Sequence, residues 1–181
     1  ALLLAIVDAL IAADIRFCLH LLGERFRRSP AEFTEISAKL ASFYQHNNIA
    51  PGHRDYLAER SDYEQVLRAA DVVLSTADHD FQGLSLLEGI ACGCTPLAPA
   101  RLVYPEYLST EFLYSGSADP AIAAASAVSS LKILANSKLA AEPLPRADIA
   151  KFRQSQLKDK YEILFSELQA SATDQSSADN R

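Results

Sequence analysis

Apolar residues recur along this chain in two patterns that predict helices and strands. Residues 2–12 carry apolar side chains three and four positions apart, which is typical of one face of a helix. Residues 15–22 form a short continuous apolar run that Gly23 closes, as expected of a buried parallel strand. The run Asp-Val-Val-Leu-Ser at 71–75 is the clearest buried strand, and residues 95–98 form another.

Helix-forming segments separate these strands. Ser29-Pro30 starts one helix with a polar cap and a proline in the first turn, and Gly93 ends another. The predicted helices after the first are 29–44, 61–70, 83–92, 118–135 and 147–169, with a weak strand near Ile49 and an apolar run ending at Tyr114. Strands that alternate with helices imply β-α-β units. The predicted fold class is therefore α/β: a Rossmann-like, doubly wound parallel sheet with helices on both faces.

The same pattern predicts how the domain is bounded. No internal repeat or linker interrupts residues 1–170, which we expect to form one domain. Residues 171–181 are polar and predict a disordered tail. The apolar start at 1–13 is too short to span a bilayer and lacks a basic flank, so it predicts a helix and no membrane segment.

Composition narrows the classes of function. The 181 residues include 49% apolar and 22% charged side chains, an ordinary globular balance. The net charge of −6 makes this chain by itself a poor electrostatic partner for nucleic acid or an anionic membrane. Cys18, Cys92 and Cys94 do not resemble a secreted disulfide framework, so we expect buried, reduced thiols in a cytoplasmic protein.

The segment after the strand at 71–75 is the best candidate for a binding site. Ligands of parallel α/β sheets sit beyond the carboxyl ends of the strands, and this strand leads there into residues 79–83. The next helix would present the amide groups of Gln82, Gly83 and Leu84 beside the positive end of its dipole. Gly83 has no Cβ, so an anion can approach its backbone closely. The segment therefore predicts a phosphate or pyrophosphate site.

Two carboxylates bracket this helix start. Asp80 lies in the loop and Glu88 inside the helix, whose side chains lean back toward its amino end. Glu88 suits the vicinal hydroxyls of a ribose, and Asp80 would meet a second polyol beyond the phosphates, so the ligand would be a nucleoside diphosphate sugar. Alternatively, Asp80 only caps the helix and Glu88 is a solvated surface acid. A glycoside-hydrolase dyad is disfavoured because it would not need the helix amides.

These residues carry a resemblance to a known family. The segment at 78–99 reads DHDFQGLSLLEGIACGCTPLAP and resembles the E-x7-E motif of GT-B retaining glycosyltransferases of family 4. The resemblance implies that Glu88 binds the nucleotide ribose and Asp80 the donor sugar hydroxyls, as the candidate catalytic pair. Asp80 replaces the first glutamate of the motif, so its reach is one methylene shorter. The resemblance implies neither a cofactor nor a metal.

A longer segment, residues 61–108, is similar to tRNA-queuosine mannosyltransferases and their bacterial relatives. The shared features include Ala70-Asp71-Val72-Val73, Cys92-Gly93-Cys94-Thr95-Pro96-Leu97 and Leu102-Val103-Tyr104-Pro105-Glu106. The similarity implies a hexosyltransferase that moves mannose from GDP-mannose to queuosine in tRNA. It also implies that the first strand of the domain and an N-terminal GT-B domain with the acceptor pocket would precede Ala1. We therefore expect this chain alone to be inactive.

Two other functions stay open. A family 4 enzyme with a lipid or polysaccharide acceptor would share the same donor domain, because the acceptor lies outside this chain. A Rossmann-like nucleotide-binding module without chemistry would share the fold. A dehydrogenase is disfavoured because no Gly-x-Gly-x-x-Gly follows a strand.

Further side chains are predicted to contact the donor. The donor-binding candidates are His79, Phe81, Gln82, Gly83, Leu84, Glu88 and Arg25. Arg25 follows the strand that ends at Gly23 and can bring a positive charge to the pyrophosphate, the alternative being a solvated arginine. His79 is expected to orient the donor sugar, the alternative being an ordinary loop histidine.

Overall fold

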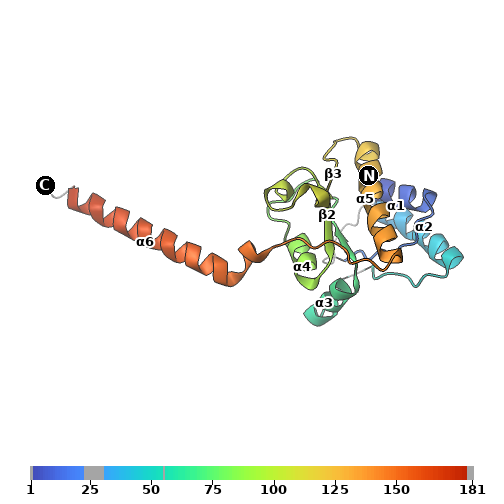
Figure 1. Ribbon diagram of the computed structural model, residues 1–181, viewed down its shortest axis with the longest axis horizontal. Helices are drawn as coiled ribbons and strands as arrows, with labels where there is room; N and C mark the ends of the chain where they lie inside the picture. The colour runs from blue at the N-terminus through green and yellow to red at the C-terminus, as the bar shows by residue number, and fades with distance from the viewer. Residues whose placement is uncertain (1, 23–30, 55, 179–181) are drawn as a thin grey trace. The chain divides into compact units, whose positions relative to one another are not determined.

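The predicted alternation of helices and strands is present in the computed structural model of the protein (Figure 1). The structure describes residues 2–22, 31–54 and 56–178. The chain divides into two units, Ala1–Ala147 and Asp148–Arg181. The candidate site belongs to the first unit.

The first unit contains all the strands of the described residues. Its elements are α1 (Leu2–Ala12), α2 (Ala31–Asn47), α3 (Arg60–Ala69), β1 (Val72–Leu74), α4 (Leu84–Cys92), β2 (Thr95–Pro99), the 3₁₀ turns η1 (Tyr104–Glu106) and η2 (Thr110–Phe112), β3 (Leu113–Tyr114) and α5 (Pro120–Leu139). Helix α4 ends at Gly93, whose φ of 103° is left-handed, as the sequence predicts for a glycine cap. Helix α5 begins with a proline, and the Asp119 carboxylate accepts a hydrogen bond from the Ala121 amide.

The strands form a parallel sheet in the order β1-β2-β3. Val72 lies opposite Thr95 and Leu74 opposite Leu97, which sets the register of the first pair. Every residue of β2 is buried, as expected for the central strand of a parallel sheet. A mixed α/β chain with such a sheet is compatible with a Rossmann-like fold.

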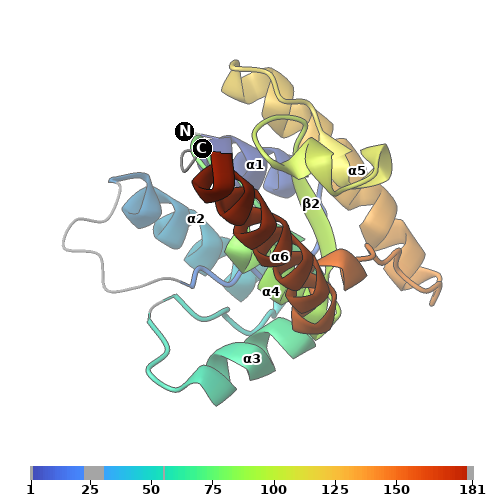
Figure 2. The ribbon, with the colours of Figure 1, turned by 90° about the vertical axis from the view of Figure 1, so that its left-hand side faces the viewer.

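Helices pack against both sides of β1. Val72 and Leu74 join a core cluster with apolar residues of α1 and α5. Val73 points the other way, because side chains alternate along a strand, and it contacts Gly89 of α4. A Cβ added at Gly89 would lie 2.7 Å from the Cβ of Val73, so glycine permits this close packing. Figures 1 and 2 show α1 lying between α2 and α5.

A second core cluster joins α1 to α2. Its buried members are Val7, Ile36, Leu40, Phe43 and Tyr44, with Leu3, Leu4, Ile11, Phe17, Leu19, Leu21, Phe33 and Ile49 packed around them. Phe17 stacks on Phe43 with ring centroids 5.0 Å apart. Helix α1 therefore contributes to both clusters and connects α2 to the sheet.

Residues 15–22 differ from the predicted buried strand. Arg16 and Cys18 are exposed, and the segment is not part of the sheet of the described residues. Its backbone instead donates from Leu21 N to His53 O at 2.9 Å. The weak strand expected near Ile49 is also irregular. Both predictions were wrong about pairing, because an apolar run does not specify which backbone lies beside it.

Two helix starts can be compared with the predictions. Helix α3 begins at Arg60, one residue before the predicted Ser61, and its N-cap Glu59 makes no side-chain capping bond. Ser29 and Pro30 lie outside the described residues, so their predicted capping role stays a prediction. The expectation of buried thiols holds for Cys94 but is wrong for Cys18, which is exposed.

The second unit consists of the 3₁₀ turn η3 (Ala150–Phe152) and the helix α6 (Gln154–Ala178). The helix continues past residue 170, so residues 171–178 are helical and not the disordered segment that their polarity predicts. The end of the domain at residue 170 stays a prediction. Within the described ranges, no helix is both long enough and apolar enough to cross a membrane.

Candidate functional site

The loops after β1 and β2 meet at the carboxyl edge of the sheet. Residues 75–83 follow β1, and Arg101 lies shortly after β2. The Arg101 Nη2 atom donates to the Ala77 carbonyl at 3.0 Å and to Asp78 Oδ1 at 2.8 Å. This arginine joins the two loops and brings a cation to the edge where ligands of parallel sheets bind.

The Asp80 carboxylate is held by three protein groups. Its Oδ1 accepts hydrogen bonds from the backbone N–H groups of Gln82 at 3.1 Å and Gly83 at 2.7 Å. Its Oδ2 accepts from the Tyr104 hydroxyl at 2.7 Å. Desolvation raises the pKa of Asp80, but the hydrogen bonds from Tyr104, Gly83 and Gln82 outweigh it and lower the pKa below its ordinary value. Asp80 is therefore an ionised carboxylate that shapes the loop before α4.

Tyr104 connects Asp80 to the end of β1. It is 0% exposed, and its hydroxyl also lies 2.7 Å from Ser75 Oγ. Desolvation is the main cause that raises the pKa of Tyr104, so its hydroxyl keeps the proton that Asp80 accepts. Gly83 fits beside this tyrosine because it has no side chain. A Cβ at Gly83 would lie 2.9 Å from Tyr104 Cε1 and would sit on a residue with φ of 67°.

The amide groups at the start of α4 differ from the predicted arrangement. The N–H groups of Gln82 and Gly83, expected to bind phosphate, donate to Asp80 instead. The helix ladder begins with Leu87 N donating to Gly83 O at 2.9 Å. The N–H groups of residues 84–86 therefore occupy the first turn, where an α-helix offers them no acceptor of its own. An anion at this helix start would be bound by residues 84–86.

Glu88 is positioned by the neighbouring helix α3. The Tyr63 hydroxyl donates to Glu88 Oε2 at 2.9 Å, and Arg60 Nη2 lies 3.5 Å from Oε1. Desolvation and the bond to Glu88 raise the pKa of Tyr63 to about 12, which keeps its hydroxyl protonated and donating. The Glu88 side chain is 40% exposed, so a ligand can still reach it.

The tip of the loop carries the other predicted donor contacts. Phe81 is 94% exposed and Leu84 is 63% exposed. His79 and Gln82 are exposed as well, whereas Gly83 is buried. The structure brings Asp80, Tyr104 and the start of α4 together and leaves these side chains in solvent. Arg25 lies outside the described residues, so its role stays a prediction.

Metal binding was considered at the acidic residues of this loop. Asp78 and Asp80 have Asp-x-Asp spacing, but Asp78 pairs with Arg101 while Asp80 accepts the loop amides. Among the residues that the structure describes, no group of three His, Cys, Asp or Glu side chains is placed to hold a metal ion. The expectation of a metal-independent site stays a prediction.

Sequence reasoning missed the tyrosines that orient the two acids. Tyr104 lies 24 residues after Asp80, and Tyr63 lies 25 residues before Glu88. The available signal was their position: Tyr104 follows the strand next to β1, whose carboxyl end must lie at the same edge. Nothing in the spacing of Tyr63 indicates its contact, because only the packing of α3 on α4 brings it to Glu88.

One curated relative is similar to part of this chain. The chain is 40% identical over 104 residues to tRNA-queuosine alpha-mannosyltransferase of Drosophila melanogaster. The matched region is 58% of this chain and 26% of that enzyme, so the chain spans about a quarter of the relative's length. No protein-family model matches the chain. The similarity supports a relationship to a glycosyltransferase.

Proposed function

We propose that this chain is the donor-binding part of a retaining glycosyltransferase that transfers mannose from GDP-mannose to queuosine in tRNA. The observation that carries the proposal is the Glu88 carboxylate, which Tyr63 orients on α4 beside the first-turn amides of residues 84–86. A carboxylate and a helix start are the groups that bind a ribose and a diphosphate. The 40% identity to the Drosophila mannosyltransferase supports the choice of sugar and acceptor.

Glu88 has the open hydrogen-bonding capacity that a ribose requires. A carboxylate has about four lone-pair positions, two on each oxygen. Tyr63 occupies one position on Oε2, and Arg60 contacts Oε1 from 3.5 Å. One position remains on each oxygen, which suits the two vicinal hydroxyls of a ribose.

Asp80 has less open capacity than Glu88. Three of its about four lone-pair positions accept from Gln82 N, Gly83 N and Tyr104 Oη. One position on Oδ2 remains for a hydroxyl of the donor sugar. Its proposed role is therefore double: it holds the loop before α4 and makes a single contact to the sugar.

The start of α4 is proposed to stabilise the leaving diphosphate. As the bond from the sugar to the diphosphate breaks, negative charge grows on the phosphate oxygens. Fixed N–H groups at residues 84–86 and the positive end of the helix dipole favour that charge without having to reorganise. Arg101 adds a full positive charge at the same edge of the sheet.

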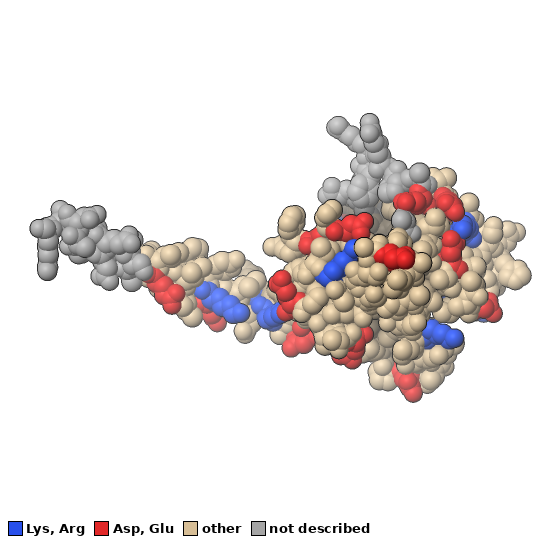
Figure 3. Space-filling model, turned by 90° about the horizontal axis from the view of Figure 1, so that it is seen from above, with Lys and Arg blue, Asp and Glu red and all other residues tan. Residues whose placement is uncertain are grey.

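The tRNA acceptor is proposed to bind mainly outside this chain. Figure 3 shows acidic and basic side chains interspersed on the visible face of the first unit. With a net charge of −6, this chain offers little attraction for a phosphate backbone. We propose that the chain forms the doubly wound half of a GT-B enzyme and that another domain supplies the acceptor pocket. A cytoplasmic location fits such an acceptor.

Calorimetric titration with GDP, GDP-mannose, UDP and UDP-glucose tests the proposal. We expect binding of the two guanine nucleotides at least about tenfold tighter than that of the uridine nucleotides. Preference for uridine nucleotides would overturn the GDP-mannose donor and favour a different glycosyltransferase of the same architecture. Binding of free GDP without any added contribution from mannose would argue against the sugar contact at Asp80.

A further inference from the structure

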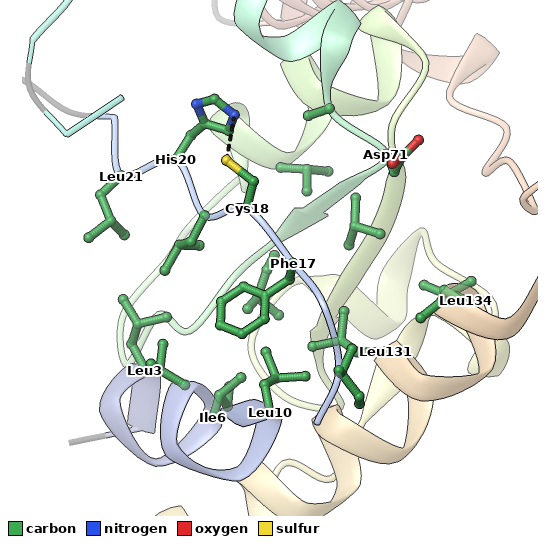
Figure 4. A pocket seen from close by; sticks show the side chains of 18 of the residues that line it. Leu3, Ile6, Leu10, Phe17, Cys18, His20, Leu21, Asp71, Leu131 and Leu134 are labelled. Atoms are coloured by element: carbon green, nitrogen blue, oxygen red, sulfur yellow. Dashed lines mark hydrogen bonds between the residues drawn. The ribbon is translucent and has the colours of Figure 1, made fainter. Parts of the chain in front are cut away.

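A large apolar cavity lies between residues 15–22 and β1 in the first unit (Figure 4). Its volume is about 1590 Å³, above the roughly 300–1,000 Å³ of ordinary small-molecule pockets. Figure 4 shows apolar side chains from three elements around it: Leu3, Ile6 and Leu10 of α1, Phe17 and Leu21 of the 15–22 segment, and Leu131 of α5. Protein cores are close-packed, so an apolar space of this size calls for a large apolar occupant.

One wall of the cavity is a backbone edge of β1. Asp71 O accepts from Thr95 N, and Ser75 N donates to Leu97 O, so residues 71 and 75 direct their backbone groups toward β2. Backbone direction alternates along a strand. The N–H and C=O groups of Val72 and Leu74 therefore point away from β2, toward the cavity that both residues line.

The opposite wall is a second strand-like edge. Phe17, Leu19 and Leu21 all pack in the α1–α2 cluster, whereas Cys18 lies outside it, which is the two-residue period of a strand. Leu19 N donates to Tyr44 Oη at 2.8 Å and Leu21 N to His53 O at 2.9 Å, both away from β1. By the same alternation, the backbone groups of residues 18 and 20 face the cavity.

Burial indicates that the sheet has an uncovered edge here. Every residue of β2 is buried, but all three apolar residues of β1 are only half-buried. Parallel strands are normally buried on both faces and paired on both sides. An edge of Val-Val-Leu beside an apolar cavity has the chemistry that binds an extended apolar strand.

We infer that this cavity binds a further β-strand, parallel to β1, which pairs with β1 on one side and with residues 15–22 on the other. The strand is apolar, rich in β-branched residues and about five residues long. It would supply acceptors and donors to Val72 and Leu74 and fill the space among the leucines of α1 and α5. With it, the sheet would run continuously from residues 15–22 to β3.

The chain direction identifies the source of this strand as a segment joined to the amino end of α1. Ile15 N donates to Leu10 O, so the carboxyl end of α1 lies where residues 15–22 begin. Leu3 packs in the same cluster as Leu21, so the amino end of α1 lies near the carboxyl edge of the sheet. A parallel strand that ends at this edge can enter α1 through a short right-handed β-α connection.

The inference is independent of the proposed donor, but it places the new strand beside the candidate site. Thr76 and Ser85 line the cavity together with Leu74, so the carboxyl end of the cavity reaches the start of α4. The loop that connects the strand to α1 would then lie next to the first-turn amides of α4. Crevices of this kind, beyond the carboxyl ends of parallel strands, are where α/β sheets bind their ligands.

Hydrogen exchange of extended versions of the chain tests the inference. The 181-residue chain is compared with versions that carry, before Ala1, a strand of alternating valine and isoleucine followed by a glycine-asparagine linker of about 2–6 residues. In the matched control, alternate strand residues are proline, which removes the N–H groups needed for pairing. We expect amide exchange at Val72, Leu74, Cys18 and His20 to slow by about tenfold or more with at least one linker length, and the melting temperature to rise.

Three results would overturn the inference. One is unchanged exchange at Val72 and Leu74 with every linker length, or a lowered melting temperature in every extended version. Another is equal protection by the proline control, which would show that no strand pairing occurs. The third is a dimer of the unextended chain in sedimentation, with Val72 and Leu74 already protected, because a second copy would then occupy the cavity.

Discussion

Asp80 and Glu88 lie at the two ends of one short stretch of chain, yet the structure uses them differently. Asp80 accepts hydrogen bonds from two backbone amides and a buried tyrosine, all within the protein. Glu88 receives one hydroxyl bond from Tyr63 and a long contact from Arg60. The first acid is therefore mostly satisfied by the fold, whereas the second is oriented by the fold and left open to a ligand.

The difference teaches that two acids of one motif need not share one role. A carboxylate at a helix start stabilises the protein by accepting amide hydrogen bonds. A carboxylate on the second turn of α4 has no such amides and depends on side chains from α3. We therefore expect changes at Asp80 to alter mainly the free energy of unfolding, and changes at Glu88 to alter mainly nucleotide affinity.

The largest expected effect is that of Glu88→Ala on nucleotide binding. Loss of two hydrogen bonds to a charged group should weaken GDP binding about a hundredfold, roughly 3 kcal/mol, in calorimetric titration. The matched control is Glu64→Ala, which removes a nearby acid that pairs with Arg60 and Arg68. Equal affinities of the two variants would remove Glu88 from the binding site.

Asp80→Ala should lower the free energy of unfolding by about 2 kcal/mol, because the amides at the helix start and the Tyr104 hydroxyl lose their acceptor. Urea denaturation measures this change. Asp78→Ala is the control, since its carboxylate is 82% exposed and its ion pair with Arg101 should contribute only about 0–1 kcal/mol. Equal stabilities would mean that Asp80 does not hold the loop.

Tyr104→Phe tests the same network from the other side. The variant removes the hydroxyl that donates to Asp80 and contacts Ser75, so we expect it to lower the free energy of unfolding by about 1 kcal/mol. Tyr161→Phe, on the exposed helix α6, serves as the control and should leave stability unchanged. A Tyr104→Phe protein as stable as the parent chain would contradict the network.

Tyr63→Phe should weaken GDP binding about fivefold, near 1 kcal/mol, because Glu88 loses the group that orients it. The variant should unfold within about 0.5 kcal/mol of the parent chain. The effect on affinity should vanish when Glu88 is already alanine, since the two residues act as one unit. An undiminished effect in that background would mean that Tyr63 contacts the nucleotide directly.

The smallest expected effect is a pH dependence due to Asp80. Its pKa is lowered in the folded protein relative to the ordinary value of 3.8, so ionised Asp80 stabilises the fold above that value. The stabilisation is lost as the pH falls through the folded-state pKa. The stability difference between the parent chain and Asp80→Asn should stay constant from neutral pH to about pH 4 and shrink below it. A difference that grows on acidification would contradict the lowered pKa.

Much of the local structure could be predicted from the sequence. The helix at α1, the strand at β1, the helix at α4 and its glycine cap at Gly93 all follow from periodicity and capping residues. These features depend on neighbours a few positions apart, which the sequence lists directly. The capping alternative for Asp80 was also foreseen, because an acid just before a helix has nearby amides to accept.

Other features could not be predicted because they depend on partners far away in the chain. The strand expected at 15–22 needed a neighbouring backbone, and it borders a cavity instead of a ladder. The amides expected to bind phosphate are those of residues 84–86, since Asp80 accepts the earlier two. The choice between an open and a satisfied carboxylate depends on Tyr63 and Tyr104, which only packing brings into contact.

The sequence by itself determined the alternation of helices and strands, the acids at 80 and 88 and the helix start between them. Periodicity and caps are local properties, so the printed residues are enough to predict them. Only the tertiary structure decided which acid is satisfied, which amides remain at the helix start and where the sheet has an open edge. These depend on hydrogen bonds between distant segments, whose geometry arises when helices and strands pack together.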